Sequence, residues 1–282
     1  MHRPMRVGGQ FYPDTPDEAR YLIEQFIHNS AHCDKTTSNG AILPHAGWMF
    51  SGQTAVRTLL SIKDLKKYRT AVILGAVHTY GVDKPVLYPD GDWETPFGNC
   101  EVDVDLIKKN SLHHIGNSNY KAHFQEHSIE VIVSLLMYFN PKIKIIPISI
   151  PSHTDCDVMN LTSILRPLYN ESCLFIASSD LTHYGYNYGD ISHGTGDAAL
   201  SWVKKEKDPA FLKLIFEKRF SEIVAFAHEN GSACGAGGIA VLSSLLNDLT
   251  PELIDYTTSY DMYPRGGASS FVSYAGIIFR SG

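Results

Sequence analysis

The fold of this chain is decided by the stretch Cys173-Leu-Phe-Ile-Ala-Ser-Ser-Asp-Leu-Thr-His183. The residues through Ala177 are all apolar, which is the pattern of a short strand buried on both faces of a sheet. The residues that follow are mostly polar and include a carboxylate at Asp180 and an imidazole at His183. A buried strand that leads directly into polar residues indicates a sheet whose ligands bind beyond the carboxyl ends of its parallel strands.

The same arrangement occurs at two other places in the chain. The run Ala41–Leu43 leads into Pro44-His-Ala-Gly47, and Thr70–Leu74 leads into Gly75-Ala-Val-His78. Lys144–Ile150 is a further strand-like run. Amphipathic helical patterns lie between these runs, over Ser51–Ser61, Ser128–Phe139 and Val158–Tyr169. This alternation predicts an α/β fold with a mostly parallel central sheet and helices on both faces.

The C-terminal third predicts further helices and two edge strands. A helical stretch is expected over Asp197–His228, another over Gly235–Leu246, and strands over Leu253–Tyr260 and Phe271–Phe279 that extend the sheet antiparallel. Residues 91–98 have the Pro and Gly content of a surface loop that overhangs a pocket. Because no repeat or linker divides the chain, residues 1–282 are expected to form a single domain.

Composition excludes several classes of protein. The chain of 282 residues is 44% hydrophobic and 19% charged, as ordinary globular proteins are. Its net charge of −6, without a basic patch, argues against a nucleic-acid partner. The longest apolar runs are too short for membrane insertion. Five scattered cysteines and the absence of a secretory signal pattern predict a cytoplasmic protein.

Three histidines follow three predicted core strands. His45 and His78 are separated by about one strand-helix-strand unit, so we expect them on neighbouring parallel strands, close enough for both imidazoles to bind one metal ion. His183 is expected at the same edge of the sheet. The chain has 13 histidines, and a single histidine is most often structural. The hypothesis of a metal site therefore depends on the three positions taken together.

Cys234 is a further candidate ligand. It lies in Ser232-Ala-Cys-Gly-Ala-Gly-Gly238, immediately before an apolar helical pattern. The N-terminus of a helix stabilises a thiolate, which can bind metal, and the glycines allow close approach. The alternative is a small buried side chain with no chemical role.

Acidic residues near the histidines admit two interpretations each. Glu126 and His127 open a predicted helix, where Glu126 suits ordinary helix N-terminal chemistry, or they line the pocket as groups that orient a ligand or transfer protons. Asp180 either caps a helix or orients His183 or a metal-bound water.

These residues, in this order, resemble the Memo family, also called AmmeMemoRadiSam system protein B. Eight short pieces along nearly the whole chain match the family pattern. They are Gly9-Gln-Phe-Tyr-Pro13, Pro44-His-Ala-Gly47 with Ser51-Gly52, Ile73-Leu-Gly-Ala-Val-His78, Thr95-Pro-Phe-Gly98, Glu126-His-Ser-Ile-Glu130, Ser178-Ser-Asp180 with His183, Ala233-Cys-Gly235 and Ser273-Tyr-Ala275.

The resemblance implies a fold similar to that of the class III extradiol dioxygenases, which are non-haem iron enzymes with two histidines and a carboxylate on the metal. It implies that His45, His78 and Cys234 are the metal ligands, and that Asp180 and His183 are the remaining polar groups of the site. A thiolate in place of the carboxylate shifts the expected metal toward copper, zinc or a differently tuned iron. In the dioxygenases a histidine at the position of His183 acts as acid and base. An imidazole is suited to this role because its usual pKa lies close to neutral pH.

The leading hypothesis is a mononuclear metal site, with iron or copper favoured and zinc possible, that supports redox or oxygenase-type chemistry. In it, His183, Asp180 and His127 are catalytic and His45, His78 and Cys234 bind the metal. One alternative is a non-enzymatic protein whose pocket, with Trp48, Trp93 and the Gly9–Pro13 turn, binds a peptide or partner. Another is a metal-free hydrolase with Cys234 as nucleophile and His183 as base. The ligand, small molecule or peptide, and the oligomeric state are not specified by the sequence.

Overall fold

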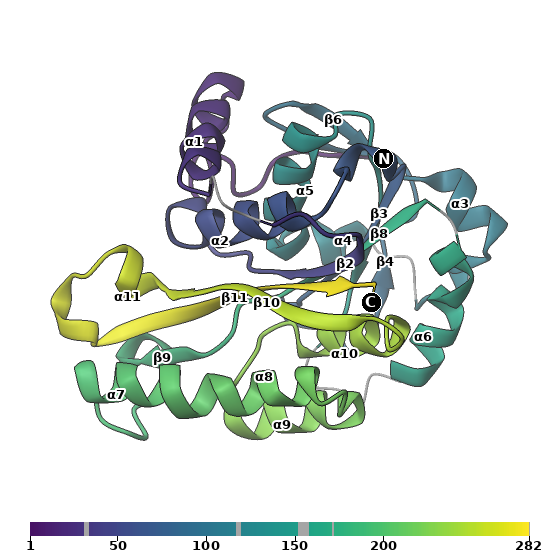
Figure 1. Cartoon of the computed structure of the whole chain (residues 1–282). Coiled ribbons are helices and arrows are strands. Elements are labelled where there is room, and N and C mark those ends of the chain that lie inside the picture. Colours follow the sequence, from purple (N-terminus) through teal and green to yellow (C-terminus); the bar gives the residue numbers. More distant parts are fainter. Residues whose placement is uncertain (31–33, 117–119, 152–157, 171, 282) are drawn as a thin grey trace.

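A computed structural model describes residues 1–30, 34–116, 120–151, 158–170 and 172–281 (Figure 1). Its main sheet has eight strands, in the order β10-β11-β2-β8-β3-β7-β4, with β9 paired to β11. Their bounds are Ser38–Leu43 (β2), Thr70–Gly75 (β3), Val86–Leu87 (β4), Lys144–Ser149 (β7), Cys173–Ser178 (β8), His183–Gly185 (β9), Thr250–Thr258 (β10) and Ser270–Arg280 (β11).

The centre of the main sheet is parallel. Strands β2, β8, β3 and β7 are successive parallel neighbours, and all six residues of β8 are buried. Strand β11 is antiparallel to both β2 and β10, and β4 is antiparallel to β7 at the other edge. The predicted α/β class is therefore confirmed, and so is the antiparallel extension by the two C-terminal strands.

Helices cover both faces of the main sheet (Figure 1). Helix α2 packs against β2, β10 and β11, and α5 packs against β3, β7 and β8. On the other face α10 packs against β3 and β8, while α8 packs against β10. The helices are Pro16–His28 (α1), Trp48–Ser61 (α2), Val104–Lys109 (α3), Tyr120–Phe124 (α4), Ser128–Phe139 (α5), Val158–Leu165 (α6), Asp197–Trp202 (α7), Asp208–Phe216 (α8), Ile223–Asn230 (α9), Ala236–Leu245 (α10) and Ser259–Met262 (α11).

The helical stretch expected over Asp197–His228 is divided. A π-helical turn, Val203–Lys207, joins α7 to α8. The chain then leaves the helix at Lys218, whose φ of 59° lies in the left-handed region, before α9 begins. The apolar spacing predicted helix correctly, but the reversal at Lys218 has no glycine or proline to mark it.

The expected strand order was wrong at one point that concerns the site. β2, which precedes His45, and β3, which precedes His78, are not neighbours, because β8 lies between them. Spacing along the sequence indicates that strands are parallel but not which strand is inserted between them. The segments that follow β2 and β3 must therefore reach across the end of β8 to meet.

The expected loop over residues 91–98 was also wrong. Most of this segment forms the hairpin of β5 (Asp92–Thr95) and β6 (Gly98–Glu101), which pairs with β1 (His2–Arg3) in a separate small sheet. Trp93 is buried there, with the Arg3 guanidinium 4.1 Å from its ring centroid. Trp48 is buried as well. Neither tryptophan is available to a partner, so both lose the binding role assigned to them in the alternative hypothesis.

Among the described residues, the helices are all too short or too polar to span a lipid bilayer. Among the described cysteines, Cys100 and Cys234 are free thiols. Cys33 and Cys156 lie outside the described residues.

Candidate metal centre

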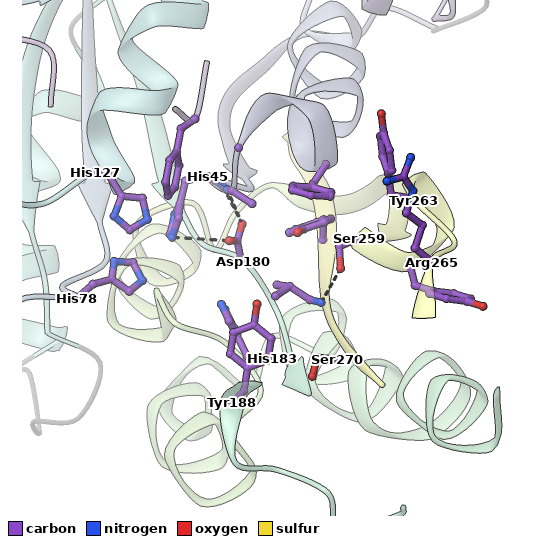
Figure 2. A pocket seen from close by; sticks show the side chains of 17 residues that line it. His45, His78, His127, Asp180, His183, Tyr188, Ser259, Tyr263, Arg265 and Ser270 are labelled. Carbon is purple, nitrogen blue, oxygen red and sulfur yellow. Dashed lines mark hydrogen bonds and ion pairs between the residues drawn. The ribbon is translucent and has the colours of Figure 1, made fainter. Parts of the chain in front are cut away.

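The functional side chains gather where the parallel strands of the main sheet end. His45 lies two residues beyond β2, His78 three residues beyond β3, and Asp180 two residues beyond β8. His183 begins β9, and His127 immediately precedes α5. Figure 2 shows these side chains on the wall of one cavity. The edge of the sheet predicted to carry the site is the edge where these residues meet.

Three imidazoles form the centre of the cluster. One ring nitrogen of each of His45, His78 and His127 lies within 4.8 Å of those of the other two. The centroid of the His45 ring is 5.2 Å from that of His78 and 5.4 Å from that of His127. Imidazole nitrogens are preferred ligands of iron, copper and zinc, whereas magnesium and calcium prefer oxygen. The cluster is therefore suited to a transition-metal ion.

The orientation of His45 is fixed by two serine residues. Its Nδ1 lies 2.9 Å from Ser178 Oγ, and that hydroxyl donates its own hydrogen to the Ser128 carbonyl oxygen at 2.7 Å. Because the Ser178 hydrogen is used in this way, Nδ1 of His45 is the donor to Ser178. In the neutral imidazole the lone pair is then on Nε2, the nitrogen that faces Cys234. A partner that fixes the tautomer in this way is typical of metal-binding histidines.

His78 is held by the carboxylate of Glu126. His78 Nδ1 lies 2.9 Å from Glu126 Oε1, and the His78 backbone N–H donates to Oε2 at 2.5 Å. Burial alone would lower the pKa of His78, but hydrogen bonds with Cys234 and Glu126 outweigh it and raise the pKa to about 11. In the metal-free protein His78 is therefore protonated, and a metal would have to displace that proton in order to bind.

Glu126 also organises the start of α5. Its Oε1 accepts hydrogen bonds from the backbone N–H groups of His127 and Ser128, both at 2.9 Å. Burial raises the pKa of the Glu126 carboxyl, but the hydrogen bonds and charge of His78 outweigh burial and hold this pKa well below its usual value. One ionised carboxylate thus positions two of the three clustered histidines, His78 and His127.

His127 behaves as a neutral imidazole. Burial, together with the neighbouring His45 and His78, lowers its pKa to about 3. Its ring stacks on that of His78, with 4.6 Å between the centroids. The sequence assigned His127 to proton transfer, and the structure adds that its ring nitrogen belongs to the group that could hold a metal. A neutral imidazole offers a lone pair for coordination.

Cys234 places a sulfur beside this group. Its Sγ lies 3.4 Å from His45 Nε2 and accepts a hydrogen bond from the Asp180 backbone N–H at 3.3 Å. Burial raises the pKa of the thiol, but the electrostatic effect of His45 and the hydrogen bonds with His45 and His78 outweigh burial and lower this pKa to about 6. At neutral pH the sulfur is therefore mostly a thiolate, the form that binds metal.

Asp180 connects the segments of the site rather than capping a helix. Its Oδ1 accepts hydrogen bonds from the backbone N–H groups of His45, at 2.8 Å, and Ala46, at 3.2 Å. Its Oδ2 lies 4.0 Å from His45 Nε2. Burial raises the pKa of this carboxyl, and the nearby His183 offsets the effect only in part. Asp180 thus holds the loop that presents His45.

His183 lies across the cavity from His45. Its Nδ1 donates to the Leu181 carbonyl oxygen at 3.1 Å, so its Nε2 can exchange a proton with a ligand. Burial lowers the pKa of His183, and the charge of Asp180 only partly restores it. The imidazole is neutral at pH 7 and can accept a proton. Tyr188 packs edge-on against the ring, 5.0 Å between centroids.

The cavity that joins these groups has a volume of about 510 Å³, within the usual range for sites that bind small molecules. It is lined by His45, His78, His127, Asp180 and His183, and its remaining wall comes largely from aromatic side chains. Phe11, from the Gly9–Pro13 turn, is part of that wall.

Residues 3–278 match the family model described as Memo-like protein. The chain belongs to the Memo family. It is 33% identical to a MEMO1 family protein of Thermococcus onnurineus, over 99% of this chain and 100% of that one. It is 34% identical to one of Thermococcus kodakarensis, with the same coverage. The resemblance inferred from the motifs is confirmed.

A solved structure similar to this Memo family member is that of an uncharacterized protein of Escherichia coli K12. The TM-score is 0.50 and the identity 12%, over 86% of this chain and 99% of that one. At this identity the similarity concerns the fold alone. The relation of the Memo fold to the extradiol dioxygenases stays a prediction.

Sequence reasoning missed several residues of the Memo site. Ser178 was seen only as part of a motif, although its hydroxyl orients His45. Tyr188 and Arg265 line the cavity from distant parts of the chain. Nothing in their local sequence marks them, because the contacts that bring them to the cavity are made by β9 and β11.

We expect the thiol of Cys234 to titrate near pH 6 in chelator-treated protein, where an ordinary cysteine titrates near 9. Since the pKa is lowered, the thiolate is present above about pH 6 and is lost as the pH falls below it. The ultraviolet absorbance of the thiolate, followed against pH, measures this transition, and Cys234→Ala serves as the baseline. Burial raises the pKa of Cys100 to about 12, so its signal does not overlap. A Cys234 transition near pH 9 would contradict the inferred contact with His45.

Proposed function

We propose that this Memo family protein binds one transition-metal ion between His45, His78, His127 and Cys234 and uses it for oxidoreductase-type chemistry on an organic substrate. The observation that carries the proposal is the convergence of three imidazole nitrogens within 4.8 Å of one another. The Cys234 sulfur, 3.4 Å from His45 Nε2, extends the donor set. Two of the imidazoles, His45 and His78, have partners that fix the nitrogen facing the cluster.

The donor set favours iron or copper, and zinc is also compatible. Imidazole suits all three metals, and a thiolate favours copper(I), zinc or iron over the metals that require oxygen ligands. A bound iron or copper ion would supply one-electron redox chemistry with dioxygen. The loop glycine Gly235, between Cys234 and α10, keeps the sulfur close to the sheet, since a Cβ there would lie 2.4 Å from the Ser178 carbonyl oxygen.

The contribution of the chain's own residues to the reaction is proton transfer. His183 is neutral, its Nδ1 is held by the Leu181 carbonyl oxygen, and its ring lines the cavity. We assign to its Nε2 the acceptance of a proton from the substrate and its return to the product. Asp180 positions the loop that carries His45, because it accepts hydrogen bonds from the backbone N–H groups of His45 and Ala46.

A second candidate function is a cysteine-dependent hydrolase, and the lowered pKa of Cys234 favours it. The base in that reaction would be His45, whose Nε2 is 3.4 Å from the sulfur. Among the described hydrogen bonds, those of Cys234 include none to His183, the base expected from the sequence. The metal proposal accounts for more of the site, because the hydrolase leaves His78 and His127 without a role.

Metal analysis of anaerobically purified protein without an affinity tag tests the proposed function. We expect one iron or copper ion per chain and an absorption spectrum that changes when air is admitted. Protein that stays free of metal, even after incubation with iron(II), copper(I) or zinc and desalting, would reject the proposal. Retention of zinc without any response to air would support a metal site but reject redox chemistry.

A further inference from the structure

The cavity extends well beyond the histidine cluster, and its far end has a different chemical character. Figure 2 shows His78 and His127 at one side of the cavity and Tyr263 and Arg265 at the opposite side. Arg265 is the single arginine or lysine among the described residues that line it. Both groups of residues face the same space, so a ligand that occupies the cavity contacts both.

Arg265 differs from several other arginines of the protein in its contacts. Arg3, Arg57 and Arg280 each pair with a carboxylate. Across the part of the chain that the structure describes, Arg265 forms no ion pair. Its guanidinium lies 5.4 Å from the centroid of the Tyr263 ring, and its backbone N–H donates to the Tyr263 carbonyl oxygen at 2.8 Å. The charged group is exposed, and its hydrogen-bond donors are available to a ligand.

The wall between the two ends of the cavity is aromatic. It is made largely by six rings from separate parts of the chain, Phe11, Phe50, Tyr188, Tyr260, Tyr263 and Tyr274. Such a wall suits a ligand with an aromatic or otherwise apolar body. The other acidic or basic groups of the lining are Asp180, engaged by backbone N–H groups, and the histidines.

We propose that Arg265 recognises the acidic group of the ligand, and that this ligand is an organic anion, a carboxylate or phosphate, with an apolar or aromatic body. A guanidinium matches the planar or tetrahedral oxygens of these groups with paired hydrogen bonds. The chain has a net charge of −6, so its overall field repels anions and a local cation is needed to hold one. That the other end of the ligand reacts at the histidine cluster rests on the proposed function.

The test uses three probes of matched shape, 3-phenylpropanoate, 2-phenylethyl phosphate and the neutral 3-phenylpropanamide. Binding of each is measured by titration calorimetry to protein as purified and to chelator-treated protein. We expect both anions to bind more tightly than the amide, and the tighter anion identifies the acidic group. Arg265→Gln should weaken the binding of the anions by about ten- to a hundredfold and leave that of the amide unchanged.

Arg20→Gln is the matched control. The Arg20 guanidinium lies 5.7 Å from the Tyr138 ring centroid, a contact like that of Arg265 with Tyr263, but Arg20 is not in the cavity. It should bind every probe as the unmodified protein does. Metal content, measured in the same samples, should not change in Arg265→Gln.

The outcomes separate this inference from the proposed function. Anion binding that depends on Arg265 in chelator-treated protein supports the inference even if no metal is ever found. If anion binding is lost on chelation and is unchanged in Arg265→Gln, the anion binds to the metal. That result overturns the inference and supports the metal site. Equal affinity for amide and anions, or no binding of either anion, also overturns it.

Discussion

We expect the replacement of His45 with alanine to abolish the proposed stoichiometric metal binding. His45 has the most constrained imidazole of the cluster, because Ser178 holds its Nδ1 and Asp180 holds its backbone N–H. Loss of a ligand should reduce metal affinity by more than the roughly ten- to hundredfold typical for residues that only support a ligand. Elemental analysis of tag-free protein measures the effect. Thermal unfolding of the chelator-treated variant shows whether the chain is folded, and His45→Gln provides a second variant.

The same measurement distinguishes between His127 and Cys234 as further ligands. Of the variants His127→Ala and Cys234→Ala, the one with the greater loss of metal identifies the stronger donor. His228→Ala, on the exposed part of α9, is the control and should retain all the metal. Unchanged metal content in His45→Ala would refute the assignment of ligands, whatever the behaviour of the other variants.

Arg3→Met is expected to lower the free energy of unfolding by about 3–5 kcal/mol, the usual effect of breaking a buried ion pair. The Arg3 guanidinium is fully buried and lies 2.6 Å from Glu130 Oε2. It also donates to the carbonyl oxygens of His123 and Glu126, at 2.9 and 2.6 Å. Without it the charge of Glu130 stays buried and two carbonyl groups lose a donor. Urea denaturation followed by circular dichroism measures the change.

Arg280→Met is the comparison for Arg3→Met. Arg280 pairs with Glu252 at 3.2 Å, but both side chains are about half exposed, 50% and 42%. An exposed pair of this kind contributes about 0–1 kcal/mol. Similar losses in the two variants would contradict the view that burial makes the Arg3 contact strong. If Arg3→Met does not fold, Arg3→Lys, which keeps the charge and loses the paired geometry, should fall between the two.

The parts of the site that could be predicted from the sequence are those set by a single strand and its continuation. His45, His78, Asp180 and His183 follow buried apolar runs, and the ends of parallel strands share one edge of a sheet. Their meeting follows from local sequence and a general rule of α/β folds. The contact of Glu126 with His78 could also have been predicted, because a carboxylate commonly orients a histidine ligand.

The parts that could not be predicted depend on contacts between distant residues. The insertion of β8 between β2 and β3 leaves no mark in the sequence of any of the three strands. Residues 91–98 have the composition of a loop, yet they form a hairpin because β1 pairs with it and Arg3 packs on Trp93. His123 is fully buried, where its Nε2 contacts the Val86 carbonyl oxygen, although nothing in its local sequence marks it as a core residue.

The position of β11 has a consequence for the stage of synthesis at which the candidate site can form. β2 lies between β8 and β11, so the strand that leads to His45 gains its second neighbour only when residues 270–280 have been synthesised. A nascent chain on the ribosome, even with all its histidine and cysteine donors already translated, therefore lacks the finished sheet that holds them in register. For a metal bound as proposed, we therefore expect loading to follow the synthesis of the whole chain, because the cluster depends on these long-range strand pairs.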